Sequence, residues 1–205
     1  MKIITAIALA LQFAAATTSF ARPVDLGFAI RATPYEPFMK PVKQVLADLD
    51  GRESDFTRVR RLLQIGRGFR YSFTEPYVAA SPKRTAALRA GDCKAKSLWL
   101  IDQLNDQSVR YVIGKARVNS PMSHAWVMWN DGSSWWILDP TNKREPIRAD
   151  QVSNREYVAI YSYGKDGARL HRGHDAAVSK RDRSRDFIAD ALSRNSELRR
   201  IRRWR

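Results

Sequence analysis

The sequence predicts a fold of mixed helices and antiparallel strands, the α+β class. Three observations indicate it. Apolar residues recur at helical spacing over residues 94–104. Two aromatic-rich segments, 124–129 and 134–138, flank an Asn-Asp-Gly sequence at 130–132, which is a strong hairpin signal. Helix patterns come first along the chain, and strand patterns dominate from residue 109 onward.

The chain begins with the features of a signal peptide. Lys2 precedes an apolar run over residues 3–16, which is short for a membrane span. Ser19 and Ala21 are small residues at the positions that a signal peptidase prefers. We therefore expect residues 1–21 to be cleaved rather than kept as an N-terminal anchor helix, and the mature protein to be periplasmic or secreted.

The segment after the signal peptide predicts an irregular arm followed by two helices. Three prolines fall within residues 22–38 and favour irregular structure. Apolar residues at helical spacing follow Pro41, and Asp50-Gly51 ends that pattern. A second helix begins near Asp55 and is interrupted by the glycines at positions 66 and 68.

Further along, the pattern changes from short segments to a longer helix and then to strands. Residues 69–73 alternate and indicate a short extended segment, and residues 85–89 indicate a helical turn. The helix over 94–104 has a broad apolar side, so we expect it to pack deep in the core. Beside the predicted hairpin, the strand patterns cover 109–118 and 156–163.

The composition changes at residue 164, which divides the mature chain into a domain over 22–163 and a basic segment over 164–205. The basic segment holds 13 Lys and Arg residues against 6 Asp and Glu residues. Residues 165–185 indicate a loose charged linker. Residues 184–205 predict an amphipathic C-terminal helix with Phe187, Ile188 and Leu192 on its apolar stripe.

The formal net charge of +15 and the pI near 10.4 favour anionic partners. Export argues against nucleic acid as the natural partner, so no nucleic acid is expected. Anionic lipid and acidic cell-wall polymer remain as partners for the basic residues of 184–205.

Cys93 is the only cysteine of the chain, so it cannot form an internal disulfide. It is a reactive thiol, an intermolecular linker or a buried bystander. Its place after Gly91-Asp92, at the start of a helix, is one that suits a reactive thiol, because the helix dipole stabilises a thiolate. The N–H groups of the first helical turn can also hold an oxyanion. On position alone, the reactive and the buried alternatives are equally supported.

His124 and Asp139 favour the reactive alternative. Counting outward from a turn at Asp131-Gly132 places His124 opposite Asp139 across the hairpin. There the carboxylate could orient the imidazole as a general base for Cys93. The alternative is a structural histidine and an aspartate that caps a turn. The spacing favours the catalytic interpretation.

The other two histidines, His171 and His174, lie in the predicted charged linker. They have neither an acidic cluster nor a second cysteine nearby, so they form a poor metal site. We therefore expect both to be exposed, and we predict no metal site and no cofactor.

Three motifs occur in order: Gly91-Asp92-Cys93, His124-Ala125-Trp126, and the Trp-Ile-Leu-Asp-Pro-Thr sequence at 136–141. Together they resemble the transglutaminase-like branch of the papain-like superfamily, in particular the bacterial transglutaminase-like cysteine peptidases. The similarity covers roughly residues 55–141, including Phe-Arg-Tyr at 69–71 and Ser-Pro at 81–82.

The resemblance implies an α+β core in which the cysteine helix packs on an antiparallel sheet that carries the histidine and the aspartate. It also implies that Cys93 is the nucleophile, His124 the general base and acid, and Asp139 the orienting residue. Lys94 and Lys96 depart from the acidic residues common after the family's cysteine, so the substrate preference stays open.

The expected function is that of an exported cysteine-dependent amide hydrolase or acyl transferase acting on protein or peptide amides through a thioester, with hydrolysis favoured over cross-linking. The alternative is a catalytically idle transglutaminase-like domain that binds anionic lipid or cell-wall polymer through its basic C-terminal helix. Tyr71 and Gln64 are the two upstream candidates for an oxyanion-stabilising side chain.

Overall fold

The computed structural model describes residues 22–51, 54–74 and 77–172. Its helices are α1 (Lys40–Ala47), α2 (Phe56–Gly68), α3 (Pro82–Leu88) and α4 (Cys93–Leu104), with the 3-10 helices η1 (Glu36–Phe38) and η2 (Ala149–Gln151). Its strands are β1 (Phe28–Ile30), β2 (Arg70–Tyr71), β3 (Ala90–Gly91), β4 (Val109–Arg117), β5 (His124–Asn130), β6 (Trp135–Leu138), β7 (Ile147–Arg148), β8 (Glu156–Gly164) and β9 (Gly167–Leu170). The predicted α+β class is confirmed.

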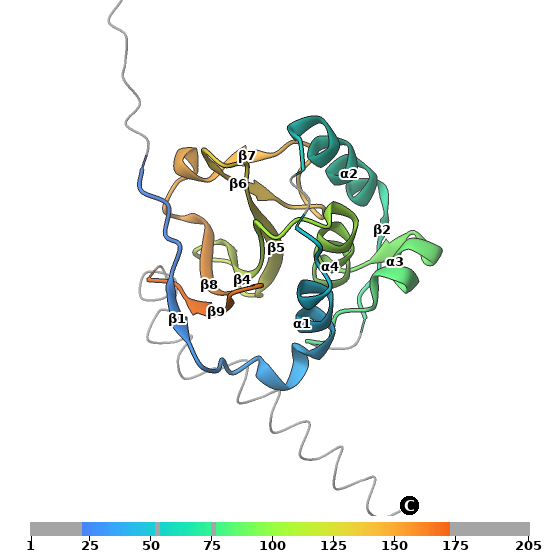
Figure 1. Ribbon diagram of the computed structural model, residues 1–205, viewed down its shortest axis with the longest axis horizontal. Helices are drawn as coiled ribbons and strands as arrows, with labels where there is room; N and C mark the ends of the chain where they lie inside the picture. Colours follow the sequence, from blue (N-terminus) through green and yellow to red (C-terminus); the bar gives the residue numbers. More distant parts are fainter. Residues whose placement is uncertain (1–21, 52–53, 75–76, 173–205) are drawn as a thin grey trace, which may run out of the picture.

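Seven of these strands form one antiparallel sheet in the order β1-β9-β8-β4-β5-β6-β7. Strands β2 and β3 form a separate two-stranded parallel sheet just before the cysteine helix. The α-helices gather on one side of the large sheet, and α4 lies among the others (Figure 1). The middle strand β4 and its neighbour β5 therefore lie where the sheet is supported by strands on both sides.

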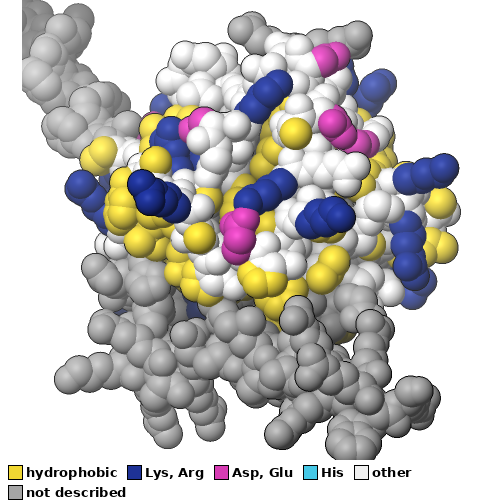
Figure 2. Space-filling model, turned by 60° about the horizontal axis from the view of Figure 1, so that its bottom comes forward, with side chains coloured by type: hydrophobic (Ala, Val, Ile, Leu, Met, Phe, Trp, Pro, Cys, Tyr) yellow, Lys and Arg dark blue, Asp and Glu magenta, His cyan; other side chains and the backbone are white. Residues whose placement is uncertain are grey.

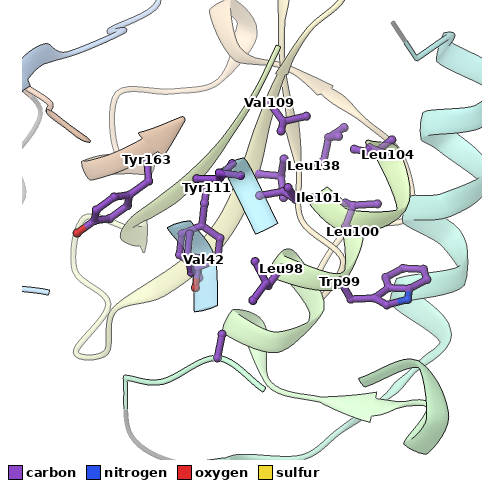
Figure 3. Packing of buried hydrophobic residues seen from close by; sticks show 14 of the residues in the cluster. Val42, Leu98, Trp99, Leu100, Ile101, Leu104, Val109, Tyr111, Leu138 and Tyr163 are labelled. Atoms are coloured by element: carbon purple, nitrogen blue, oxygen red, sulfur yellow. The ribbon is translucent and has the colours of Figure 1, made fainter. Parts of the chain in front are cut away.

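Helix α4 is the centre of the main core. It is buried on nearly all sides, as expected of a helix that is apolar around most of its circumference. Its residues Leu98 and Ile101 are fully buried and belong to one apolar cluster with Val109 of β4, Leu138 of β6 and Val42 of α1, in which Ile101 lies beside Leu138 (Figure 3). This packing fixes the end of α4 that carries Cys93 relative to the sheet.

The outer face of the sheet has its own smaller apolar cluster. Val112, Trp126 and Met128 are buried there, and Val24 and Leu26 of the N-terminal arm pack against them. Because both faces are covered, β4 is buried along most of its length. The irregular arm predicted over 22–38 thus also contains β1 and η1, and it covers part of the sheet.

The loose linker predicted to begin at residue 165 is a wrong prediction for the residues up to 170. Gly167–Leu170 form β9, which pairs with β8 on one side and β1 on the other. The charges in this stretch are paired: Arg110 and Arg169 both form ion pairs with Asp166. The charged residues of this stretch gave a sequence pattern typical of a linker, although in the fold Asp166 and Arg169 neutralise each other beside the sheet.

His171 is likewise buried, not exposed as predicted, with 1% of its surface accessible. Its Nε2 lies 2.8 Å from Ser162 Oγ, and its Nδ1 lies 3.0 Å from the Asp25 carbonyl oxygen. The imidazole thus ties the arm to β8. His174, the signal peptide predicted over 1–21 and the C-terminal helix predicted over 184–205 lie outside the described residues.

On the face shown in Figure 2, Lys and Arg side chains outnumber Asp and Glu side chains and stand as separate groups among apolar side chains. Within the described residues, no helix is long and apolar enough to cross a membrane.

Candidate active site

Cys93 is the first residue of α4, and Asp92 caps that helix. Asp92 Oδ1 accepts a hydrogen bond from the Ala95 N–H at 3.1 Å, which explains why the helix begins here. A Cβ at position 91 would lie 2.9 Å from the Ala95 Cβ, so the close approach before the helix requires glycine. The Gly-Asp-Cys sequence therefore sets the position of the thiol.

The carboxylate of Asp92 is fully buried and has several partners. Its Oδ2 accepts hydrogen bonds from the Thr74 N–H at 3.1 Å and the Thr74 hydroxyl at 2.8 Å, and it forms an ion pair with Lys94. Burial raises the pKa of Asp92, but the hydrogen bonds from Lys94 and Ala95 outweigh it and lower the pKa overall. Asp92 thus stays ionised as the cap of the cysteine helix.

His124 is the first residue of β5 and is held between two partners. Its Nε2 lies 2.8 Å from Asp139 Oδ2. Burial lowers the pKa of His124, but hydrogen bonds with Asp139 and Cys93 and the charges of both raise it to about 9. Since Nε2 faces Asp139, Nδ1 is the ring nitrogen left to face Cys93, which lines the same cleft.

Asp139 follows the last residue of β6 and is fully buried. Its Oδ1 accepts hydrogen bonds from the backbone N–H groups of Thr141 at 2.9 Å and Asn142 at 3.2 Å. Its Oδ2 accepts from Asn142 Nδ2 and from the Tyr157 hydroxyl, each at 2.9 Å. Burial raises the pKa of Asp139, but the hydrogen bond and charge of His124 and these other donors lower it.

The predicted contact between His124 and Asp139 exists, but the register that led to it is wrong. The ladder pairs Val127 with Leu138 and Met128 with Ile137, so its continuation puts Asp139 opposite Trp126. The turn is longer than the two residues assumed, because Asn130 pairs with Trp135 and leaves residues 131–134 as the loop. The side chains of His124 and Asp139 meet diagonally instead.

Tyr157 and Asn142 are the two neighbours of the site that the sequence analysis missed. Asn142 stands three residues after Asp139 in a Pro-Thr-Asn turn, and its Nδ2 donates a hydrogen bond to Asp139 Oδ2. Asparagine is typical of such turns, so the sequence could have indicated this contact. Tyr157 comes from β8 and has a backbone φ of +47°, uncommon for a tyrosine. No local sequence feature connects it with Asp139.

Of the two oxyanion candidates, only Tyr71 lies at the site. Gln64 donates from Nε2 to Glu145 Oε1 at 3.0 Å, away from the cysteine. Tyr71 lines the same cleft as Cys93, and burial together with the charge of Cys93 raises its pKa.

The two lysines after Cys93 have different surroundings. Lys94 lies in the cleft, paired with Asp92 and 5.0 Å from the centre of the Phe73 ring. Lys96 is buried on the other side of the helix and donates from Nζ to the Phe69 carbonyl oxygen at 2.5 Å. Burial and the charge of Arg67 lower the pKa of Lys96.

Cys93 and His124 line a cleft of about 290 Å³. Its lining surface is mainly apolar and aromatic, with Tyr71, Phe73 and Met122 among its residues. Within the part of the chain that the structure describes, no cluster of three or more His, Cys, Asp or Glu side chains could hold a metal ion. The chemistry available here is therefore that of a thiol, an imidazole and a buried carboxylate beside an apolar cleft.

Comparison with protein-family models gives no match, and comparison with curated protein sequences gives none either. Several solved structures are similar. LapG from Legionella pneumophila is 15% identical over 77% of this chain and 91% of its own, with a TM-score of 0.48. Its EGTA-treated form is 15% identical over 70% and 81%, with a TM-score of 0.49. A candidate cysteine protease from Cytophaga hutchinsonii is 23% identical over 58% and 44%, with a TM-score of 0.37.

Proposed function

We propose that this protein is a cysteine-dependent amide hydrolase acting on protein or peptide amides, with Cys93 as nucleophile, His124 as general base and acid, and Asp139 as the orienting residue. One observation carries the proposal. The imidazole of His124 lies 2.8 Å from the fully buried carboxylate of Asp139 and lines the same cleft as Cys93, whose charge and hydrogen bonding raise the pKa of His124.

The first step forms a thioester. His124 takes the thiol proton, and Cys93 Sγ attacks the amide carbonyl carbon. The resulting oxyanion lies at the N-terminus of α4, where the dipole is positive and the N–H groups of Cys93 and Lys94 lack intrahelical partners, the Ala95 N–H being bonded to Asp92. The imidazolium then donates its proton to the amide nitrogen. The C–N bond breaks, and the amine product leaves while the acyl group stays on sulfur.

The second step releases the acyl group. His124 removes a proton from water, whose oxygen attacks the thioester carbonyl. The C–S bond breaks, the acid product leaves, and the proton returns to sulfur. A second amine in place of water would give transfer, so the reaction products distinguish hydrolysis from cross-linking.

Export to the periplasm or beyond and contact with anionic lipid or cell-wall polymer through 184–205 belong to the same proposal. Their support is the sequence: the features of residues 1–21 and the basic residues of 184–205. A salt-sensitive pull-down with anionic vesicles or peptidoglycan, repeated on the protein without 184–205, tests the contact separately from catalysis.

The decisive experiment compares residues 22–205 of the wild type with Cys93→Ala and His124→Ala. The variants are incubated with a diverse peptide mixture, and new termini are identified by mass spectrometry. We expect cleavage with the wild type only, while circular dichroism shows that all three proteins are folded. Cleavage that persists in Cys93→Ala would refute the proposed nucleophile. A folded but inactive wild type whose Cys93 is alkylated no faster than in His124→Ala would support the catalytically idle alternative.

A further inference from the structure

The cleft beside Cys93 has a distinctive chemical character. Tyr71, Phe73 and Met122 stand at its rim, with 55%, 61% and 59% of their surfaces exposed. Its floor includes Tyr111 and Met39, both almost fully buried. Exposed large apolar side chains grouped around one concave site mark a binding surface, because a ligand that covers them removes apolar area from water.

Charged groups contribute little to this cleft. Among the described residues that line it, none is acidic, and Lys94 is the one lysine or arginine. Lys94 is not free to attract an anion: it forms an ion pair with the buried Asp92, faces the ring of Phe73, and exposes 15% of its side chain. The charge of Lys94 is thus neutralised by the buried carboxylate of Asp92, so Lys94 does not make a subsite for a substrate carboxylate.

The two exposed walls come from separate parts of the chain. Phe73 lies after β2, in the segment held to Asp92 by Thr74. Met122 lies in the loop between β4 and β5, two residues before His124. Each wall is therefore tied to one of the two reactive residues, which places an apolar group of the substrate close to the amide that is attacked.

We infer that this cleft selects polypeptide substrates that carry a bulky apolar side chain next to the scissile amide, and that Phe73 and Met122 determine this specificity. That the bound polypeptide is a substrate rests on the proposed function. The preference of the cleft for an apolar group does not depend on it. A volume of about 290 Å³ suits one aromatic or branched aliphatic side chain with its adjoining backbone. Burying such a side chain corresponds to a preference of about tenfold or more over a charged one.

The first test measures alkylation of Cys93, which needs no amide cleavage. N-benzyl iodoacetamide, iodoacetamide and iodoacetate are reacted with the protein, and each rate is divided by its rate with glutathione. We expect the normalised rate to be highest for the benzyl reagent and lowest for the carboxylate. Phe73→Ser and Met122→Ser should each reduce the benzyl preference at least threefold. Leu88→Ser, equally exposed at 61% but outside the cleft, is the matched control and should leave it unchanged.

Equal normalised rates, or a preference for iodoacetate, would overturn the inference. The second test uses peptides that differ only at the residues flanking one cleaved amide, with Phe or Leu replaced by Asp or Lys. Cleavage without an apolar preference overturns the inference while the proposed function stands. Apolar-selective alkylation without any cleavage removes the proposed function while the selectivity of the cleft stands.

Discussion

Tyr157 donates its phenolic hydroxyl to the same carboxylate oxygen of Asp139 that bonds His124, at 2.9 Å and 2.8 Å. The ring of Tyr157 also packs edge-on against Trp126, whose indole is stacked with the His124 imidazole at 6.1 Å between ring centres. Strand β8 thus supports the imidazole through two routes, one polar and one aromatic.

The first prediction concerns this hydroxyl. In Tyr157→Phe, the aromatic contact remains, and Asp139 loses one donor, so the imidazole is held less firmly. We expect kcat to fall about five- to tenfold with little change in KM, corresponding to about 1 kcal/mol for one hydrogen bond. Tyr163→Phe is the control, since it removes a buried hydroxyl bonded to Thr33 instead. A loss of kcat in the control equal to that in Tyr157→Phe would show that stability alone explains the effect.

The second prediction concerns pH. The pKa of His124 is raised to about 9, so the imidazolium that protonates the leaving amine persists at neutral pH and is lost above that value. We expect kcat/KM to fall on the basic side near pH 9, and to fall at least about one pH unit lower in Asp139→Asn, which loses the stabilising charge. NMR titration of His124 checks the assignment. A wild-type midpoint near 6.5 would contradict it.

The same shift predicts a stability change. The folded pKa of His124 lies above its unfolded value of 6.5, so its contribution to stability is fully present below pH 6.5 and is lost as pH rises through about 9. Denaturant unfolding at pH 6 and pH 9.5 should show a larger loss of unfolding free energy in the wild type than in His124→Phe. Equal losses in the two proteins would remove His124 as the cause.

The third residue to test is Gly114, which pairs with His124 across the sheet. A Cβ here would lie 2.2 Å from the Val158 carbonyl oxygen and 2.7 Å from the Trp126 ring. We expect Gly114→Ala to lower the free energy of unfolding by about 2–4 kcal/mol, because backbone and indole must both shift. Gly68→Ala is the matched control: its Cβ meets nothing within 4 Å, so it should be neutral or slightly stabilising. Denaturant unfolding of both variants measures the two free energies of unfolding, and equal values for the two variants would contradict the prediction.

The last prediction concerns His171. Burial of its imidazole lowers the pKa of this residue. A folded pKa below the unfolded value near 6.5 means that the unfolded state binds more protons, so this contribution to stability is lost as pH falls below about 6.5. We expect His171→Phe to lose about 2 kcal/mol at neutral pH, since Ser162 and the arm lose their shared partner. The variant should also be less sensitive to acid than the wild type. Equal acid sensitivity would contradict this role.

Much of the fold could be predicted because its central elements carry local signals. The apolar side of α4 and the aromatic strands of the hairpin follow from the spacing of apolar residues, and the Gly-Asp-Cys sequence marked the start of α4. The strands β1 and β9, at one end of the sheet, could not be predicted: each has three or four residues, and their pairing joins distant segments. Asp166, just before β9, is paired with Arg110 of β4, a partner that no local pattern reveals.

The candidate site divides in the same way. Cys93, His124 and Asp139 stand at element ends with recognisable motifs, and the structure brings them together. The counted register failed because loop length, which sequence leaves open, decides which residues face each other. Tyr157 could not be found, since its approach to Asp139 depends on an unusual backbone conformation in a strand from another part of the chain.

The pairing of β1 with β9 has a consequence for how the protein folds. Leu26 and Arg169, which are hydrogen-bonded beside this ladder, are 143 residues apart in sequence. The sheet can therefore close its edge only when almost the whole described chain is present, and contacts of such long range form slowly. A growing chain that lacks residues 167–170 leaves the edge of β8 without its β9 partner, so β1 cannot join the sheet until these residues have been made.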